Sequence, residues 1–411
     1  MVLSLTGSTT YGEDTMTEAE LTEFKEKLDE NIQKASDPRN QYVSIYKKKL
    51  AETVKCLQQA QIENIELREK LAEVQGLVDG PTVTPQWALP AKGCKQESHN
   101  IPVLLVSDLH YGENVNPEEM PDGNCYSPKI AELRWDKLIE NTILKTRTKG
   151  KRPQGIVVCF LGDDISGDIH DELRETNFKT PIDSCVDVVE MKTKMLKSFE
   201  AEYGKVWTVS VPGNHGRTTK KPRSKSNNEL NYDSLIAGML VKQFKNKRNF
   251  AFSTPKSGEA FCEINGHNFL ALHGDRIGSR GGQGFIGPSA TIARGQHKTL
   301  SAYSKIDKEI SWMLIGHFHV PMMLEHVIAN GTLVGYSQYA KDLKLEPTYP
   351  SQTLFYVDET YGMTDYSRIY VSDSAQLKKE QQLYRIHPVT VSMHVNKPFI
   401  VKIAKEKQRK R

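Results

Sequence analysis

Short apolar runs punctuate the middle of the chain, and each one ends just before a polar motif. Residues 101–106 are mostly aliphatic and β-branched, and residues 155–161 and 206–211 repeat this pattern. Two shorter runs cover residues 269–272 and 312–315. Continuous apolar runs of this length are typical of strands buried on both faces of a sheet. They predict an α/β (or α+β) fold with a buried sheet at its centre.

Polar motifs stand where each of these predicted strands ends. In chain order, their candidate chemical groups are Asp108, His110, Asp163, Asn214, His215, His273, His317 and His319. Open α/β sheets collect their active sites at this end of the strands. Carboxylate and amide oxygens combined with imidazole nitrogens suit Mn²⁺, Fe or Zn²⁺, and the motifs contain no cysteine that would indicate a structural zinc site. A single histidine here is more often structural, but the full set predicts a metal centre.

The order of these motifs resembles that of the calcineurin-like metallophosphoesterase superfamily, which has D-x-H, G-D, G-N-H, a later histidine and G-H-x-H. The resemblance covers about residues 101–355. It implies a four-layer β-sandwich flanked by helices, and two divalent metal ions, with Mn²⁺ the first choice and Fe or Zn²⁺ the alternatives. It also implies a ligand set: one metal held by Asp108, His110 and His319, a second held by Asn214, His273 and His317, and Asp163 bridging both. His215 matches no ligand position and stands beside the substrate in that family.

Two positions depart from the family pattern. Gly216 stands where an acid usually follows G-N-H, and Ser166 stands where the second motif often has its last Asp. Such acids commonly orient metal-binding histidines, which leaves that role open here, and Asp164, Asp168 and Asp275 are the carboxylates that could substitute. The Arg-Gly pair of the serine/threonine protein phosphatases is absent after the second motif, which disfavours that branch.

The implied chemistry is metal-dependent hydrolysis of a phosphoric ester. Two metals sharing a carboxylate can activate a water as hydroxide and clamp a phosphate for in-line attack, with His215 as general acid. Our first prediction for the substrate is a phosphodiester of DNA or RNA, which makes the protein nuclease-like. A phosphomonoesterase acting on a protein or small molecule is the alternative. A third hypothesis is a helical scaffold whose phosphoesterase domain only binds.

Basic segments lie beside the motifs and at the end of the chain. Residues 217–225 follow the Gly-Asn-His motif with five positive charges, and residues 402–411 form a basic tail. Arg217, Arg276 and Arg280, the last in a glycine-rich stretch, are the predicted substrate-binding residues. Ordinary solvated loops explain these charges equally well, and a net charge of +4 does not by itself imply nucleic acid.

The first hundred residues differ in kind. Residues 1–79 predict a helical region, in which residues 41–75 carry a heptad seam with Asn64 at an a position. A parallel homodimeric coiled coil and a single amphipathic helix packed on its own protein both fit this pattern. Residues 80–99 predict a linker to a metallophosphoesterase domain at 100–385, and residues 386–411 a basic tail.

Three further expectations come from spacing and hydropathy. The six cysteines show no paired spacing, which predicts reduced thiols in a cytoplasmic protein without membrane contact. The alternating pattern of residues 322–339 predicts a hairpin that turns at Asn330-Gly331. Residues 353–357 and 367–371 predict strands of a second sheet.

Overall fold

The computed structural model describes residues 84–90, 100–150, 152–278 and 288–386. The chain divides into two units, Met1–Glu69 and Lys70–Arg411. The predicted helices and dimeric coiled coil at 41–75, most of the predicted linker, the basic tail from residue 387 onward and Arg280 all lie outside the described residues. They stay predictions, as do the domain boundaries.

The first sheet contains the three longest predicted strands as parallel neighbours. Its six strands run in the order β11-β10-β1-β2-β3-β4, with bounds β1 (Ile101–Val106), β2 (Ile156–Phe160), β3 (Val206–Ser210), β4 (Phe250–Ser253), β10 (Ser351–Asp358) and β11 (Gly362–Tyr370). Val103 pairs with Val157, and Val157 with Trp207. The carboxyl ends of β1, β2 and β3 therefore meet at one edge.

The second sheet carries the later motifs. Its order is β5-β6-β7-β9-β8, with bounds β5 (Ala260–Ile264), β6 (His267–Leu272), β7 (Trp312–Ile315), β8 (Met322–Leu324) and β9 (Val327–Ala329). Strands β6 and β7 are parallel, and Leu272 pairs with Ile315. The residues that follow these two strands are thus brought together as well.

Two sequence predictions in this region are wrong. The hairpin turns at Glu325-His326, between β8 and β9, while the Asn330 side chain is buried and donates hydrogen bonds to Ser107 Oγ and Gln352 Oε1. Tertiary hydrogen bonding thus overrides the local turn preference of Asn-Gly. Strands β10 and β11 extend the first sheet rather than the second, because β10 pairs antiparallel with β1.

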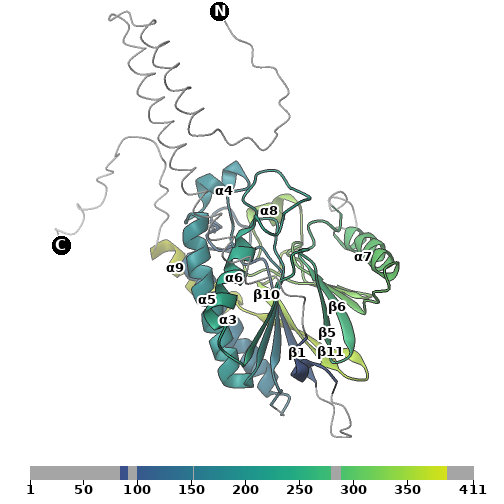
Figure 1. Ribbon diagram of the computed structural model, residues 1–411. Coiled ribbons are helices and arrows are strands. Elements are labelled where there is room, and N and C mark those ends of the chain that lie inside the picture. The colour runs from purple at the N-terminus through teal and green to yellow at the C-terminus, as the bar shows by residue number, and fades with distance from the viewer. Residues whose placement is uncertain (1–83, 91–99, 151, 279–287, 387–411) are drawn as a thin grey trace, which may run out of the picture. The chain divides into compact units, whose positions relative to one another are not determined.

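Three apolar clusters join helices and sheets into four layers (Figure 1). Leu104 on one face of β1 packs in a cluster with residues of α3 (Pro128–Arg147), α5 (Pro181–Tyr203) and α6 (Tyr232–Phe244). Leu105 on the other face packs with Phe269 and Leu314 of the second sheet. The far side of that sheet packs on Ile292 of α7 (Ser289–Ser304). Because side chains alternate along a strand, each sheet is covered on both faces, and the predicted α/β class is confirmed.

Three shorter or peripheral helices complete the described part of the chain: α4 (Asp171–Thr176), α8 (Gln338–Asp342) and α9 (Ser374–Ile386), together with a 3-10 turn at Gln86–Ala88. A fully buried ion pair holds α9 to α3, with Arg134 Nη2 2.7 Å from Glu380 Oε2. Among the described residues, none of these helices has the length and apolar character needed to cross a membrane.

Capping residues set where the main helices begin. Ser127 and Thr180 accept hydrogen bonds from the first turns of α3 and α5, each of which has proline at its start. Asn231 caps α6 by accepting from the N–H of Asp233. Because α6 begins beside the edge where β2 and β3 end, its cap places Asn231 and Asp233 next to the polar motifs.

Candidate metal centre

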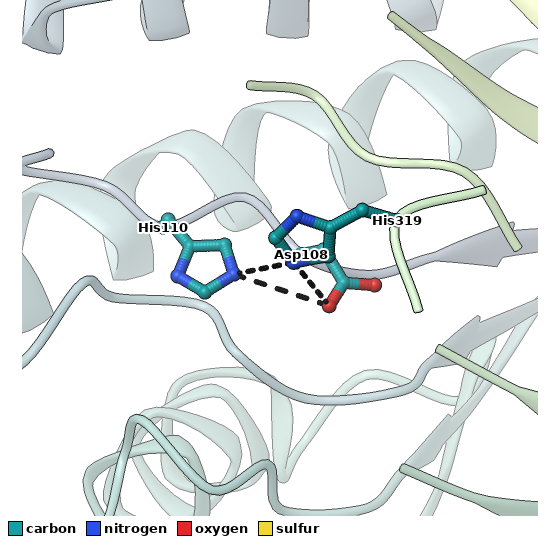
Figure 2. A group of neighbouring side chains, drawn as sticks. All are labelled: Asp108, His110 and His319. Carbon is teal, nitrogen blue, oxygen red and sulfur yellow. Dashed lines mark hydrogen bonds and ion pairs between the residues drawn. The ribbon is translucent and has the colours of Figure 1, made fainter. Parts of the chain in front are cut away.

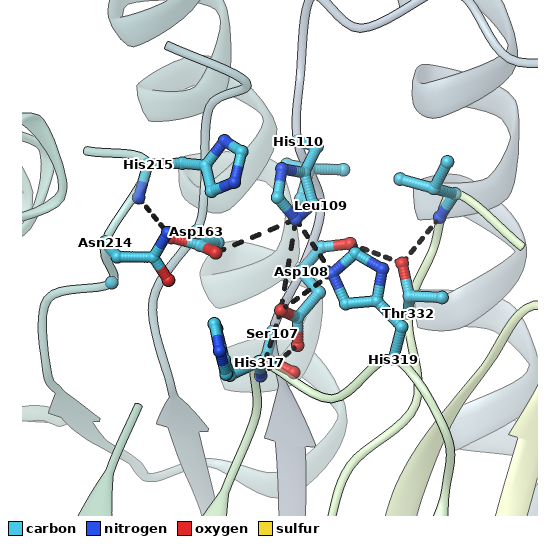
Figure 3. A network of polar contacts seen from close by, with 12 residues as sticks. Ser107, Asp108, Leu109, His110, Asp163, Asn214, His215, His317, His319 and Thr332 are labelled. Atoms are coloured by element: carbon cyan, nitrogen blue, oxygen red, sulfur yellow. Dashed lines mark hydrogen bonds and ion pairs between the residues drawn. The ribbon is translucent and has the colours of Figure 1, made fainter. Parts of the chain in front are cut away.

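The seven predicted ligands come together where the strands of both sheets end. Asp108 and His110 follow β1, Asp163 follows β2, and the other ligands follow β3, β6 and β7. Figure 3 shows Asp108, His110, Asp163, Asn214, His317 and His319 turned toward a common centre, with His215 beside them. The structure therefore gathers residues that lie as much as 211 positions apart in the chain (108 to 319).

The first group contains Asp108, His110 and His319 (Figure 2). His319 Nε2 lies 3.1 Å from His110 Nε2 and 3.3 Å from Asp108 Oδ1. The Nδ1 atoms of both histidines are buried without a hydrogen-bond partner, and that of His110 lies 4.0 Å from Glu113 Oε2. Two imidazole nitrogens and a carboxylate oxygen converging in this way form a donor set that could hold a metal ion.

The second group contains Asp163, His273 and His317, with Asn214 beside them. His273 Nε2 lies 3.1 Å from Asp163 Oδ2 and 3.1 Å from Asn214 Oδ1. His273 Nδ1 donates a hydrogen bond of 2.7 Å to the Leu161 carbonyl, which turns Nε2 toward the other candidate ligands. This arrangement is a second donor set that could hold a metal ion.

Asp163 lies between the two groups. Its Oδ2 atom is 3.7 Å from His110 Nε2 in the first group and 3.1 Å from His273 Nε2 in the second. One carboxylate is therefore shared by two clusters of potential ligands.

The backbone at five of these ligands adopts the left-handed conformation that favours glycine. The φ angles are 53° at Asp108, 44° at His110, 55° at Asp163, 72° at His317 and 58° at His319. Such a conformation costs roughly 1–3 kcal/mol per residue and persists only where surrounding contacts hold it. The N–H of His317 donates to both carboxylate oxygens of Asp108, at 3.0 and 3.1 Å, and is one such contact. Concentrated backbone strain of this kind is typical of functional sites.

The buried candidate ligands shift one another's pKa values in different directions. Burial disfavours ionisation of Asp163, but the charges of His273, His215 and His110 together outweigh burial and hold the pKa of Asp163 well below its ordinary value. Burial likewise opposes the charged form of His273, yet Asp163 raises the pKa of His273 to about 10. Burial and then the charge of His273 lower the pKa of His317 to about 4. His273 thus keeps a proton, which a metal ion binding at this nitrogen would have to displace.

Asp233 is a buried carboxylate that sequence reasoning missed. Its Oδ2 accepts hydrogen bonds from the N–H groups of Asp163 (3.0 Å) and Gly213 (2.8 Å), and its Oδ1 accepts from that of Asp164 (3.2 Å). Asn231 donates to the Gly213 carbonyl at 2.8 Å. The start of α6 therefore fixes the loops that present Asp163 and Asn214. The Asn-Tyr-Asp sequence matches a helix cap, but nothing local to it indicates a metal site.

The same residues explain Gly216. A Cβ atom at Gly216 would lie 2.4 Å from Asn231 Oδ1 and 2.8 Å from Asp233 Cγ. No side chain fits there, so the acid that usually follows Gly-Asn-His in the resembled family has no space in this chain. Asn231 and Asp233 occupy that volume instead.

His215 is oriented by a backbone group. Its Nδ1 donates to the Ser166 carbonyl at 2.8 Å, and its N–H donates to Asp163 Oδ1 at 2.7 Å. Its ring centroid is 4.5 Å from that of His110. The orienting acceptor is therefore a carbonyl rather than the carboxylate of Asp164, Asp168 or Asp275. Asp164 is instead buried in an ion pair, 2.5 Å from Lys192 Nζ.

Two of the predicted substrate-binding arginines hold a loop in place. Arg217 donates hydrogen bonds to the carbonyls of Thr219 (2.9 Å) and Lys220 (3.1 Å). Arg276 donates to the Arg223 carbonyl at 2.7 Å. Part of the hydrogen-bonding capacity of these guanidinium groups is thus used inside the basic segment itself.

Comparison with known proteins assigns no family. No family model and no curated protein matches the chain. A solved structure that it matches is a Thermotoga maritima protein determined by solution NMR. That match has 14% identity and a TM-score of 0.26, and it covers 65% of this chain and 98% of that one. A likeness this weak carries no argument, so the site must be interpreted from its own geometry.

Proposed function

We propose that this protein is a dinuclear-metal-dependent phosphoesterase of the calcineurin-like type, with the four-layer sandwich of that superfamily. The ions are two divalent cations, with Mn²⁺ the first choice and Fe or Zn²⁺ the alternatives. One group of ligands consists of Asp108, His110 and His319, and the other of Asn214, His273 and His317. The observation that carries the proposal is the position of Asp163, whose carboxylate lies within 3.7 Å of histidine nitrogens from both groups.

The chemistry follows from these donors. Two bound divalent ions would lower the pKa of a water toward neutrality and polarise a phosphoryl group. Asp163 is ionised, since the surrounding histidines, His273 foremost, together hold its pKa well below the ordinary value against the effect of burial, and its carboxylate would be the oxygen ligand shared by both ions. His215 has its Nδ1 proton committed to the Ser166 carbonyl, which leaves Nε2 to carry a proton to the leaving oxygen. Burial lowers the pKa of His215, so the negative charge of a bound phosphate would be needed to keep a proton on Nε2.

The preferred substrate is a phosphodiester of DNA or RNA. The basic segment at 217–225 begins two residues after His215 and supports a polyanionic substrate. A phosphomonoesterase is the second candidate, and the internal hydrogen bonds of Arg217 and Arg276 favour it because they reduce what the segment offers to a nucleic acid. The scaffold hypothesis rests on the predicted N-terminal helices.

The test is a hydrolysis assay with purified protein and Mn²⁺. Bis(p-nitrophenyl) phosphate, p-nitrophenyl phosphate and labelled single- and double-stranded DNA and RNA would be compared, with Asp163→Asn as the control. Cleavage of nucleic acid that disappears in the variant would support the nuclease proposal. Turnover of the monoester with intact nucleic acid would support the phosphomonoesterase. Absence of hydrolysis by a folded, metal-loaded protein would overturn both.

A further inference from the structure

A pocket of about 300 Å³ opens beside the second group of ligands. Its walls come from three segments, at residues 224–229, 256–259 and 272–276, and His273 contributes to the last. Pockets at the small end of the usual range for ligand sites hold one compact group rather than a polymer. The pocket therefore adjoins the candidate metal centre at His273 and is limited in size.

Hydrogen bonds between the walls fix the shape of this pocket. Arg276 ties the third wall to the first through the Arg223 carbonyl at 2.7 Å. Asn228 Nδ2 donates to the Pro255 carbonyl at 2.6 Å and so ties the first wall to the second. Asn228 Oδ1 also accepts from Ser234 in α6. Because each wall is held by another, the pocket is formed before any ligand binds.

The lining of this pocket does not suit a phosphate group in addition to the one proposed to bind at the metal centre. Lys256 and Arg276 are accompanied by Glu229 and Asp275, so that the charges balance, and a further acid, Glu259, accepts a hydrogen bond from Tyr303 outside the pocket. The remaining lining is rich in hydroxyl and amide groups of serine and asparagine. Such a surface offers hydrogen bonds to an uncharged polar group and little net attraction to an anion.

The pocket and His215 border different candidate ligands. The pocket adjoins His273 and Gly274, whereas the His215 ring lies 4.5 Å from His110. A phosphodiester has two organic substituents, one that leaves and one that stays on phosphorus. With the leaving oxygen next to His215, the other substituent is directed toward His273 and the pocket.

We infer that this pocket binds a single nucleoside, the group that stays on the phosphate during hydrolysis. The inference rests on the proposed function and narrows it. Water adds to phosphorus, the P–O bond to the leaving alcohol breaks, the alcohol oxygen receives the proton, and a nucleoside monophosphate is the product. Because the pocket holds one nucleoside, the enzyme releases mononucleotides from the end of a strand instead of cutting within it.

The experiment compares two diesters with the same leaving group, in the presence of Mn²⁺. One is the p-nitrophenyl ester of thymidine 5′-phosphate, and the other is methyl p-nitrophenyl phosphate, whose retained methyl group leaves the pocket empty. Asn227→Trp fills the pocket from a lining residue that is not itself a candidate ligand. The matched control is Asn246→Trp, at an exposed asparagine in the turn after α6.

The wild-type protein is expected to have a kcat/KM for the thymidine ester at least about tenfold above that for the methyl ester, equivalent to ~1.4 kcal/mol of added binding. Asn227→Trp should abolish this preference, while Asn246→Trp should preserve it. A single strand labelled at its 3′-terminal nucleotide should yield labelled mononucleotides at the earliest times. Equal turnover of both esters, or a preference that survives Asn227→Trp, overturns the pocket assignment alone. Absence of turnover with both esters overturns the proposed function.

Discussion

Replacing Asp233 with asparagine separates the positioning of the metal ligands from the folding of the chain. The carboxylate accepts three backbone N–H groups, two at Oδ2 (from Asp163 and Gly213) and one at Oδ1 (from Asp164). An amide has only one acceptor oxygen. In the better orientation, that oxygen keeps the two bonds at Oδ2, and the new NH₂ group faces the N–H of Asp164.

The least disruptive outcome of Asp233→Asn thus leaves one buried donor unsatisfied, at a cost of roughly 1–3 kcal/mol. The variant also removes an unfavourable charge, since burial and then the neighbouring carboxylates of Asp164 and Asp163 raise the pKa of Asp233 to about 7. These effects oppose each other in the free energy of unfolding, so thermal stability is a poor measure of the role of Asp233. Both effects of the substitution should weaken metal binding, because the loops lose a hydrogen bond that holds them and the site loses a nearby negative charge.

We expect Asp233→Asn to weaken Mn²⁺ binding by about 10- to 100-fold, as is usual when a group that orients metal ligands is lost. Isothermal titration calorimetry on the metal-free protein measures this directly, and circular dichroism checks that the variant is folded. Asp136→Asn, which removes an exposed carboxylate 2.6 Å from Lys194, is the matched control and should bind Mn²⁺ normally. A folded Asp233→Asn variant whose affinity stays within twofold of wild type would refute the reasoning.

Three other predictions test separate parts of the site. His215→Ala should lower kcat by ~10²–10⁴-fold and keep Mn²⁺ affinity; loss of Mn²⁺ in calorimetry would instead make His215 a ligand. Mn²⁺ affinity should rise as the pH increases from 7 toward 10, because Asp163 raises the pKa of His273 to about 10 against burial and the metal must displace that proton. Titrations at several pH values check this, and a flat profile would contradict it. Gly216→Asp should destabilise the protein by ~1–3 kcal/mol or more in urea unfolding, because its Cβ would lie 2.4 Å from Asn231 Oδ1; an unchanged midpoint would be inconsistent with that clash.

The central strands could be predicted because a strand buried on both faces has a continuous run of apolar residues in its own sequence. β1 and β2 are buried along their whole length, and their sequences are almost continuously apolar. The partner of β10 could not be predicted in the same way. Ile101 pairs with Val357, and no periodicity within either strand encodes a contact across that much chain. The misplaced hairpin has a similar cause, since Asn330 is held by side chains distant in the sequence.

The candidate ligands were accessible from sequence because each one directly follows a strand and belongs to a short motif. Their supporting groups were not. Asp233 bonds to backbone groups 70 and 20 positions away, and the acceptor for His215 is the Ser166 carbonyl, a group that every residue type possesses. Steric exclusion at Gly216 likewise depends on the start of α6. Support of this kind is visible only once the chain is folded.

The left-handed backbone at five candidate ligands has an evolutionary consequence. Glycine adopts this conformation without the penalty that a Cβ atom brings, so His110→Gly or His319→Gly would relieve strain while removing an imidazole. Under the proposed function, selection for activity would keep these histidines, whereas relief of backbone strain would favour glycine. Under the proposed function, a related chain with glycine at either position would have lost an implied metal ligand while keeping the left-handed backbone of the loop.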